Sequence, residues 1–250
     1  MLIDINKKIR EIYKLYFVQI KDKHSELFNR EEFSNVFVTG VLDDWETAKN
    51  RIMIVGEEAA WRDISDWGYI EREVENSQEW VIKLLYDQIN PPKYGFKKNR
   101  RPFWKRFRRI AERFQNASFC YANIDSINSV KTKNKALKIV DRKKLHSTKI
   151  RILQEVINII KPTLVIFFGW HNVSLKHEFE DLYNKIYPYK EGDTSNFINE
   201  EKAIVDYDKD GIKYIFTYHP SYVMARTKKY ANNEEYEETI IKRINALVMH

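Results

Sequence analysis

Four short apolar runs, each followed directly by glycine or polar residues, constrain the fold of this sequence more than any other feature. The runs are residues 51–55, 118–123, 163–168 and 212–217. Short runs of this kind are typical of strands that are buried on both faces, as in a parallel sheet. Before the fourth run, residues 203–207 and the Asp210-Gly211 turn predict a hairpin, which adds an antiparallel strand at the sheet edge.

Helical patterns lie before and between these runs. Residues 5–30, 103–114 and 150–160 each place apolar side chains on one helical face. Strands that alternate with helices predict a sheet covered by helices on both faces. We therefore expect an α/β fold, a three-layer α/β/α sandwich with a central, mostly parallel four-stranded sheet. It should form a single domain over residues 1–250, with a helical N-terminal extension over about 1–45.

The charge balance favours an anionic partner. The 43 Lys and Arg residues exceed the 36 Asp and Glu residues, which gives a formal net charge of +7. The single cysteine, Cys120, excludes a disulfide framework, a four-Cys zinc site and an iron-sulfur cluster built from this chain alone. No run has the length of a membrane span. We expect a soluble, cytoplasmic, monomeric protein that has no membrane partner and needs no metal or other cofactor.

Polar clusters follow the strands on the side where ligands bind. In parallel sheets, ligands bind at the carboxyl ends of the strands. Loops are expected to begin there at residues 56–58, 123–125 and 219–221, which read Gly-Glu-Glu, Asn-Ile-Asp and His-Pro-Ser. The sequence thus predicts that acidic, amide and histidine side chains converge on one edge of the sheet.

Four segments in this order resemble a known family. They read VGEEAAW, YANIDSIN, KPTLVIFFG and TYHPSYVMAR, and they fall within residues 51–226. This order resembles the uracil-DNA glycosylase superfamily, whose members have a water-activating loop after the first strand, an Asn after the second and a His-Pro-Ser loop after the last. The resemblance implies a DNA glycosylase that binds the DNA backbone and a flipped base.

The chemistry of base removal requires such residues. Cleaving a base from deoxyribose creates an oxocarbenium-like sugar and an anionic leaving base, so a carboxylate and a donor are needed. Glu57 or Glu58 can orient water, and His219 can donate to the base. Glu58 matches the Asp of the family's Gly-Gln-Asp-Pro-Tyr-His loop, and Glu57 matches the Glu of its Gly-Glu-Ala-Pro-Gly loop; both stay open. Asn123 is the candidate reader of the flipped base.

The resemblance also implies roles at the base pocket. Ala60 stands where the uracil branch has a Tyr that excludes 5-substituted pyrimidines, so a larger base can fit. The aromatic residue that stacks the base is left open between Trp67 and Tyr69, with Trp61 as a rival.

In the last segment, Ser221 is expected to contact a DNA phosphate and Arg226 to bind DNA. Val223 or Met224 matches the wedge that fills the gap left by the flipped nucleotide.

A dense basic stretch gives separate support for DNA binding. Residues 93–101 carry Lys97, Lys98, Arg100 and Arg101, and the helix that follows carries Lys105, Arg106, Arg108, Arg109 and Arg113 with only Glu112 as internal offset. This pattern predicts a phosphate-binding surface without sequence preference, with Arg101, Lys105 and Arg108 among its contacts. A second basic stretch spans residues 131–149.

Three classes of function follow. The first is a monofunctional DNA glycosylase that removes a damaged or modified pyrimidine; directed at bulky 5-modified cytosine in phage DNA, the same chemistry would serve antiviral defence. The second is a non-catalytic DNA or nucleobase-binding module. The third, another α/β hydrolase or nucleotide-binding enzyme, lacks a phosphate-binding loop, a nucleophile elbow and a dinucleotide glycine pattern in this sequence.

Overall fold

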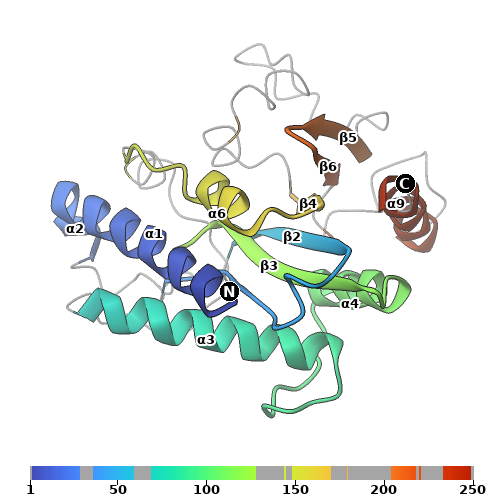
Figure 1. The fold of residues 1–250 in the computed structure, drawn as a ribbon, viewed down its shortest axis with the longest axis horizontal. Helices are drawn as coiled ribbons and strands as arrows, with labels where there is room; N and C mark the ends of the chain where they lie inside the picture. The colour runs from blue at the N-terminus through green and yellow to red at the C-terminus, as the bar shows by residue number, and fades with distance from the viewer. Residues whose placement is uncertain are drawn as a thin grey trace.

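A computed structural model describes residues 2–28, 36–58, 69–127, 144, 148–169, 179, 204–217, 220 and 233–248. Figure 1 shows the arrangement of its helices and strands. The helices are α1 Leu2–Lys23, α2 Ser25–Phe28, α3 Ile70–Ile89, α4 Pro102–Arg113, α6 Ile152–Ile160 and α9 Asn233–Val248. The strands are β1 Gly40–Val41, β2 Asn50–Glu58, β3 Ala117–Asp125, β4 Leu164–Phe168, β5 Ile204–Lys209 and β6 Ile212–Thr217.

The strands form one six-stranded sheet in the order β1-β3-β2-β4-β6-β5. Its four central strands are parallel to one another, and β1 and β5 pair antiparallel at the two edges. The predicted α/β fold with a parallel four-stranded centre is confirmed. The edge strand β1 was not predicted, because a two-residue strand has no sequence pattern of its own and forms by pairing with β3.

The predicted hairpin at the other edge is confirmed. Strands β5 and β6 pair antiparallel from Ile204↔Thr217 to Lys209↔Ile212. Asp210 and Gly211 make the turn with φ angles of 55° and 76°. Two consecutive positive φ angles are typical of the two-residue turn that matches the twist of a hairpin, and Asp-Gly is a favoured sequence for it.

The helices differ from the sequence-based expectation in number and limits. The predicted helix over 5–30 is divided at His24 into α1 and α2, whereas α4 and α6 lie where they were expected. Helix α6 ends at Lys161, which has a left-handed φ of 47°, directly before Pro162. Helices α3 and α9 were not predicted, although Val74, Val81 and Leu85 lie on a buried face of α3 at helical spacing.

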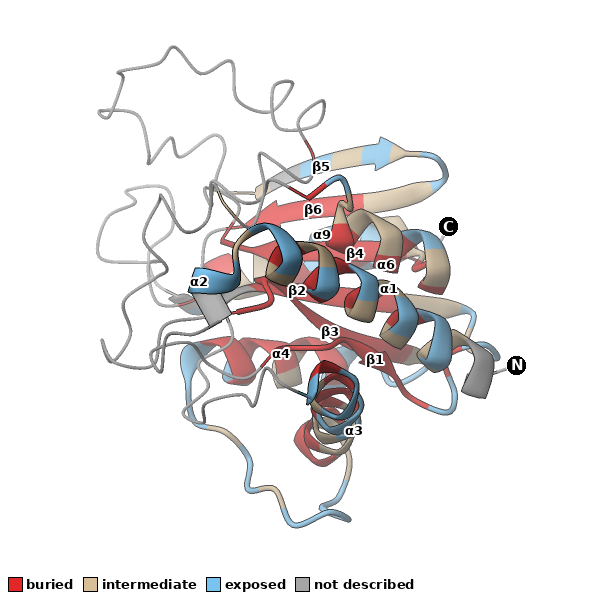
Figure 2. Cartoon of the chain, turned by 90° about the vertical axis from the view of Figure 1, so that its left-hand side faces the viewer, coloured by how far each residue is buried: buried red, intermediate tan, exposed pale blue. Residues whose placement is uncertain are grey.

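The sheet is the middle of three layers. Figure 1 shows α1 and α6 on one face and α3 and α4 on the other, and Figure 2 shows that the central strands are buried. Helix α9 contacts α4. No helix in the part of the chain that the structure describes is long and apolar enough to cross a membrane.

Helix α4 runs opposite to the parallel strands. Near its end, the ring of Phe107 lies 5.8 Å from the ring of Phe119 in the first half of β3. Near its start, the ring of Phe103 lies 5.0 Å from Tyr121 and 5.6 Å from Phe168, toward the carboxyl ends of β3 and β4. Helix α4 therefore begins at the sheet edge where parallel strands of this kind bind ligands.

Candidate active site

The carboxyl ends of β2, β3 and β4 lie at the edge of the sheet where α/β proteins bind ligands, and this part of the edge is called the crevice here. The strand order reverses at β2, because the chain goes from β2 to β3 on one side of it and from β4 to β5 and β6 on the other. Ligands bind where connections from neighbouring strands leave in opposite directions, because a gap opens between them. The residues at this point of the sheet are Gly56 and Asn123, which are paired in the register.

Asn123 is held in a defined orientation at this point. Its side chain is 1% exposed, and its Oδ1 accepts a hydrogen bond of 2.7 Å from the hydroxyl of Tyr121, two residues earlier on the same face of β3. Burial raises the pKa of the Tyr121 phenol, so that the hydroxyl stays protonated and able to donate. The bond fixes which end of the Asn123 amide is the acceptor.

Gly56 allows this side chain to lie close to β2. A Cβ atom at position 56 would lie 2.8 Å from Oδ1 of Asn123 and 3.2 Å from Cε2 of Phe103. Both atoms belong to buried side chains, so neither can move aside at low cost. Any residue other than glycine at position 56 would therefore displace Asn123 or Phe103.

Aromatic side chains form the wall beside Asn123. Phe103 of α4 lies against Tyr121 and Phe168, and the ring of Trp104 lies 4.9 Å from that of Tyr121. Phe103 and Trp104 were predicted only as part of the apolar face of their helix, and their position beside the site was not predicted. No signal in the sequence distinguishes a wall residue from a core residue here, since both belong to one apolar face.

Strand β2 extends further than predicted. Glu57 and Glu58 were expected to open a loop after Gly56, and residues 123–125 were expected to open another. Instead β2 continues to Glu58 and β3 to Asp125, and the register pairs Glu58 with Asp125. The pairing of the two strands, which a single run of sequence does not reveal, keeps these residues in the sheet.

Several predicted site residues lie outside the described part of the chain. They are Ala60, Trp61, Trp67, His219, Ser221, Val223, Met224 and Arg226. The backbone of Glu57 and Glu58 is described, but their side chains are not. Pro220, next to His219, is described and is buried. Tyr69 precedes α3; its ring is 62% exposed and carries the guanidinium of Arg72 at 4.8 Å.

Of the predicted basic contacts, Arg101 lies at the start of α4, on the side of the crevice. It is exposed, and its positive charge opposes the rise in the pKa of Tyr121. Lys105 is exposed on the next turn. Arg108 is half-buried and donates from Nη1 to Oε1 of Gln88 at 2.9 Å.

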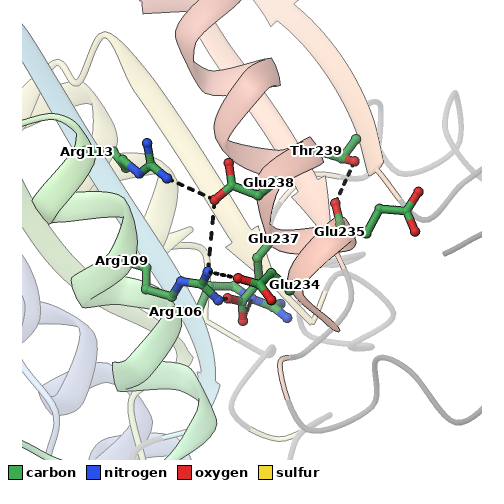
Figure 3. A network of polar contacts seen from close by, with 8 residues as sticks. All are labelled: Arg106, Arg109, Arg113, Glu234, Glu235, Glu237, Glu238 and Thr239. Atoms are coloured by element: carbon green, nitrogen blue, oxygen red, sulfur yellow. Dashed lines mark hydrogen bonds and ion pairs between the residues drawn. The ribbon is translucent and has the colours of Figure 1, made fainter. Parts of the chain in front are cut away.

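The sequence-based expectation is wrong for the remaining arginines of α4. Arg106, Arg109 and Arg113 do not belong to an open phosphate-binding surface, because they pair with Glu234, Glu237 and Glu238 of α9 (Figure 3). The acidic partners come from a helix more than a hundred residues later in the chain, so the local sequence could not reveal them. We call this set the α4–α9 charge network.

Arg106 is the buried member of the α4–α9 charge network. Its side chain is 2% exposed, and its Nε lies 3.4 Å from Oε1 of Glu237. Its guanidinium lies 5.4 Å from the ring of Phe168 and 5.3 Å from that of Tyr236. These contacts are cation–π interactions on two sides of one charge. Arg106 thus joins α9 to Phe168, which is part of the wall beside Asn123.

No group of three or more His, Cys, Asp or Glu residues that could hold a metal ion occurs among the described residues. Cys120, the single cysteine, is buried in β3.

Comparison with known proteins identifies a family. The model of the uracil DNA glycosylase superfamily matches residues 83–245, which is more than half of the chain. The matched segment contains Asn123, the crevice end of β3, the basic helix α4 and the segment that follows β6. No match was found among curated proteins.

Proposed function

Because this chain belongs to the uracil DNA glycosylase superfamily, we propose that it is a monofunctional DNA glycosylase. It flips a damaged or modified pyrimidine out of DNA and hydrolyses the N-glycosidic bond, which leaves an abasic site. The observation that carries the proposal is the juxtaposition of Gly56 with the oriented amide of Asn123 at the carboxyl ends of β2 and β3. A polar group fixed at such a point suits the recognition of one flipped base.

The proposed reaction needs a base reader, a water activator and a donor for the leaving base. The bond between C1′ and the base breaks, its electron pair leaves with the base, and water adds to C1′ with loss of a proton. Glu57 or Glu58 orients this water and offsets the positive charge on the sugar. His219 donates a hydrogen bond to the anionic base, and no metal or other cofactor takes part in this scheme.

The strand register supports Glu58 over Glu57 as the water activator. Alternate positions of a strand lie on the same face of the sheet. Position 58 therefore shares the face of Gly56, Asn123 and Asp125, whereas position 57 lies on the opposite face. This register position favours Glu58 as the residue that acts on the same nucleotide as Asn123.

Asn123 reads the Watson–Crick edge of the flipped base, with Tyr121 as the residue that positions it. Phe103 is a candidate for the stacking role in addition to Trp67 and Tyr69, since it lies against Gly56 and Tyr121. The exposure of Tyr69 at the start of α3 leaves that residue free to contact DNA outside the crevice.

DNA is held around the crevice by the basic start of α4 and by the segment after β6. Arg101, Lys105 and Arg108 contact phosphates on one side. Ser221 and Arg226 contact phosphates on the other, and Val223 or Met224 enters the gap left by the flipped nucleotide.

The sequence around position 60 bears on the choice of base. Ala60 lacks the bulk that would exclude a 5-substituent, which favours a modified pyrimidine over unmodified uracil. A bulky 5-modified cytosine, such as phage DNA can carry, would make the protein an antiviral enzyme, whereas a deaminated base would make it a repair enzyme.

Strand breakage after mild alkali tests the proposal. The purified protein is incubated with oligonucleotides containing uracil, hypoxanthine or xanthine, and with phage DNA carrying unmodified, hydroxymethylated or glucosylated cytosine. Alkali-labile sites are expected in the uracil DNA or in a DNA with modified cytosine, whereas the purines hypoxanthine and xanthine and the unmodified cytosine serve as controls. Salt-sensitive binding without such sites in any DNA would contradict the proposal and would favour the non-catalytic binding module.

Single substitutions then assign the residues. Glu58→Gln is expected to lower the rate by a factor of roughly 100 or more, and Glu57→Gln much less. Gly56→Ala should cause a comparable loss through displacement of Asn123. Gly211→Ala in the β5–β6 turn is the control; alanine is strained there at a φ of 76°, but the turn lies at the amino end of β6, away from Asn123, so the folded variant should keep full activity. Full activity of Gly56→Ala would overturn the assignment of the crevice.

A further inference from the structure

The connection between α3 and α4 is a candidate for a second nucleic-acid contact. Residues 90–101, called the basic loop here, project from the layer formed by these two helices and are largely exposed (Figure 2). The loop carries Lys93, Lys97, Lys98, Arg100 and Arg101, and no acidic residue stands between Asp87 and Glu112. Its charge is therefore uniformly positive along its whole length.

Asp87 fixes the first half of the basic loop. Its buried carboxylate accepts backbone N–H bonds from Lys93 at 2.7 Å, from Tyr94 at 2.9 Å and from Phe96 at 2.8 Å. Burial alone would raise the pKa of Asp87, but these bonds and the charge of Lys98 lower it below its ordinary value. The carboxylate of Asp87 thus holds the backbone of the loop and leaves the side chains of Lys93 and Tyr94 outside.

Gln88 and Lys98 fix the second half. The amide of Gln88 donates to the carbonyl of Lys97 at 3.1 Å and accepts from the backbone N–H of Asn99 at 2.8 Å. Lys98 turns inward, because its Nζ donates to the carbonyls of Gln88 at 2.7 Å and of Asn90 at 2.8 Å. The ring of Phe96 packs edge-on against Trp80 at 5.3 Å. A loop ordered in advance loses little conformational entropy when it binds a ligand.

The loop presents an aromatic ring among cations. Tyr94 is 41% exposed, and its ring is approached by Nζ of Lys93 at 5.2 Å and Nζ of Lys83 at 5.9 Å. The ring of Tyr86 lies 5.5 Å away in an edge-on contact. Among the described residues, the exposed side chains of Lys93, Lys97 and Arg100 have no carboxylate within ion-pair distance. Lys83 pairs with Glu79, so Lys93 is the cation at the ring that has no such partner. Exposed aromatic rings beside exposed cations are typical of surfaces that bind single-stranded nucleic acid, in which bases stack on the ring and phosphates contact the cations.

We propose that the basic loop binds a single-stranded segment of DNA, with Tyr94 stacking on an unpaired base and Lys93, Lys97 and Arg100 contacting phosphates. This inference rests on the proposed function in one respect: it takes the bound nucleic acid to be the DNA on which the enzyme acts. The loop ends at Arg101, at the start of α4, whose Phe103 lies 5.0 Å from Tyr121, so the bound strand continues from the side of the crevice. Unpaired DNA is favoured over duplex because a paired base offers no free face to Tyr94.

Binding of unmodified DNA tests the inference without any need for catalysis. Fluorescence anisotropy is measured for labelled oligothymidine and for a duplex of the same length, with wild type, Tyr94→Ala and a Lys93→Gln/Lys97→Gln double variant. Tyr94→Ala is expected to weaken binding of the single strand by about five-fold or more, and binding of the duplex much less. The double variant should also reduce the dependence of the single-strand affinity on salt.

Two further variants separate the loop from general charge. Lys242→Gln removes one exposed cation of α9, far along the chain from the basic loop, and should leave single-strand binding within about two-fold of wild type. Asp87→Ala removes the carboxylate that orders the loop and no cation, and should weaken single-strand binding; if this variant does not fold, Gly95→Ala strains the loop at a φ of 87° instead.

An unchanged affinity of Tyr94→Ala for the single strand would overturn the inference. An equal loss for single strand and duplex would overturn it as well, since it would indicate a duplex path over the loop. The proposed function has an independent readout: if wild type binds the single strand through Tyr94 but yields no alkali-labile sites, the glycosylase proposal fails and the loop inference stands.

Discussion

One continuous basic stretch of sequence is divided in this structure into a half with exposed cations and a half with paired arginines. From Lys93 to Lys105 the cations are mostly exposed, and the carboxylate of Asp87 is occupied by backbone N–H groups. From Arg106 to Arg113 three arginines pair with glutamates of α9. The comparison teaches that a run of positive charge defines a nucleic-acid surface only where the fold supplies no acidic partner.

The two halves also differ in what their charges stabilise. In the α4–α9 charge network, Arg106 holds the C-terminal helix against the sheet and against Phe168, so its charge is part of the core. In the basic loop, backbone order comes from Asp87 and Gln88, so the exposed cations contribute little to folding. Removing charge from the α4–α9 charge network should therefore mainly lower stability. Removing charge from the basic loop should mainly weaken DNA binding.

The largest effect is expected at Arg106. Arg106→Ala removes a buried side chain with its contacts to Phe168 and Tyr236, while Glu237 keeps its pair with Arg109, and should lower the free energy of unfolding by about 2–3 kcal/mol, measured by urea denaturation. Lys105→Gln, one residue earlier and exposed, is the matched control and should change it by less than about 0.5 kcal/mol. A loss below about 1 kcal/mol at Arg106 would mean that the network does not anchor α9.

A smaller effect is expected at the exposed end of the same network. The side chain of Arg113 is 60% exposed and its Nη2 lies 3.2 Å from Oε1 of Glu238, where solvent screens the pair. Arg113→Gln should lower the free energy of unfolding by about 0.2–1 kcal/mol in the same urea experiment. A loss of stability as large as that of Arg106→Ala would show that burial does not determine how much each arginine contributes to stability.

The paired half of the basic stretch can also be made to resemble the exposed half by removing its acidic partners. Glu234→Gln with Glu238→Gln removes acidic partners from Arg109 and Arg113 and adds no cation. Arg109 keeps its pair with Glu237, but Arg113 becomes available to phosphates, so DNA binding should strengthen at low salt and its salt dependence should steepen by about one phosphate contact. The measurement is the slope of log affinity against log salt concentration. An unchanged slope would mean that this surface of α4 does not face DNA.

The smallest effect concerns pH and the basic loop. The pKa of Asp87 is lower in the folded protein than in the unfolded chain, so its ionised form stabilises the fold above the unfolded pKa, and this contribution disappears only as pH falls through the folded pKa. The backbone N–H groups of Lys93, Tyr94 and Phe96 should therefore stay protected from hydrogen exchange from neutral pH down to about pH 5. Loss of protection within that range would contradict the assigned role of Asp87.

The sequence predicted the central sheet and the β5–β6 hairpin because local patterns specify them. Apolar runs ending in glycine gave β2 and β4, and Asp210-Gly211 gave the hairpin turn. Helix α3 had a readable pattern, with Ile70, Val74 and Val81 at helical spacing. Strand β1 had none, because its two residues owe their strand conformation to β3.

At the candidate site, the sequence identified residues more successfully than the contacts between them. It predicted that Gly56 and Asn123 share one edge, and the register confirms that they are paired. It did not predict the hydrogen bond from Tyr121, the wall residue Phe103 or the pairing of Arg106 with Glu237. Each of these contacts depends on how the side chains are placed in the three-dimensional fold.

The most direct test of the central claim is to detect the released base itself. Wild type and Asn123→Ala are incubated with each DNA of the substrate panel, and the small-molecule fraction is analysed by mass spectrometry for free pyrimidine. The account predicts that wild type releases one free base for each abasic site formed, and that Asn123→Ala releases it roughly 100-fold more slowly while still binding DNA. Equal release by the two proteins would contradict the role of Asn123, and no free base from any DNA would contradict the glycosylase assignment itself.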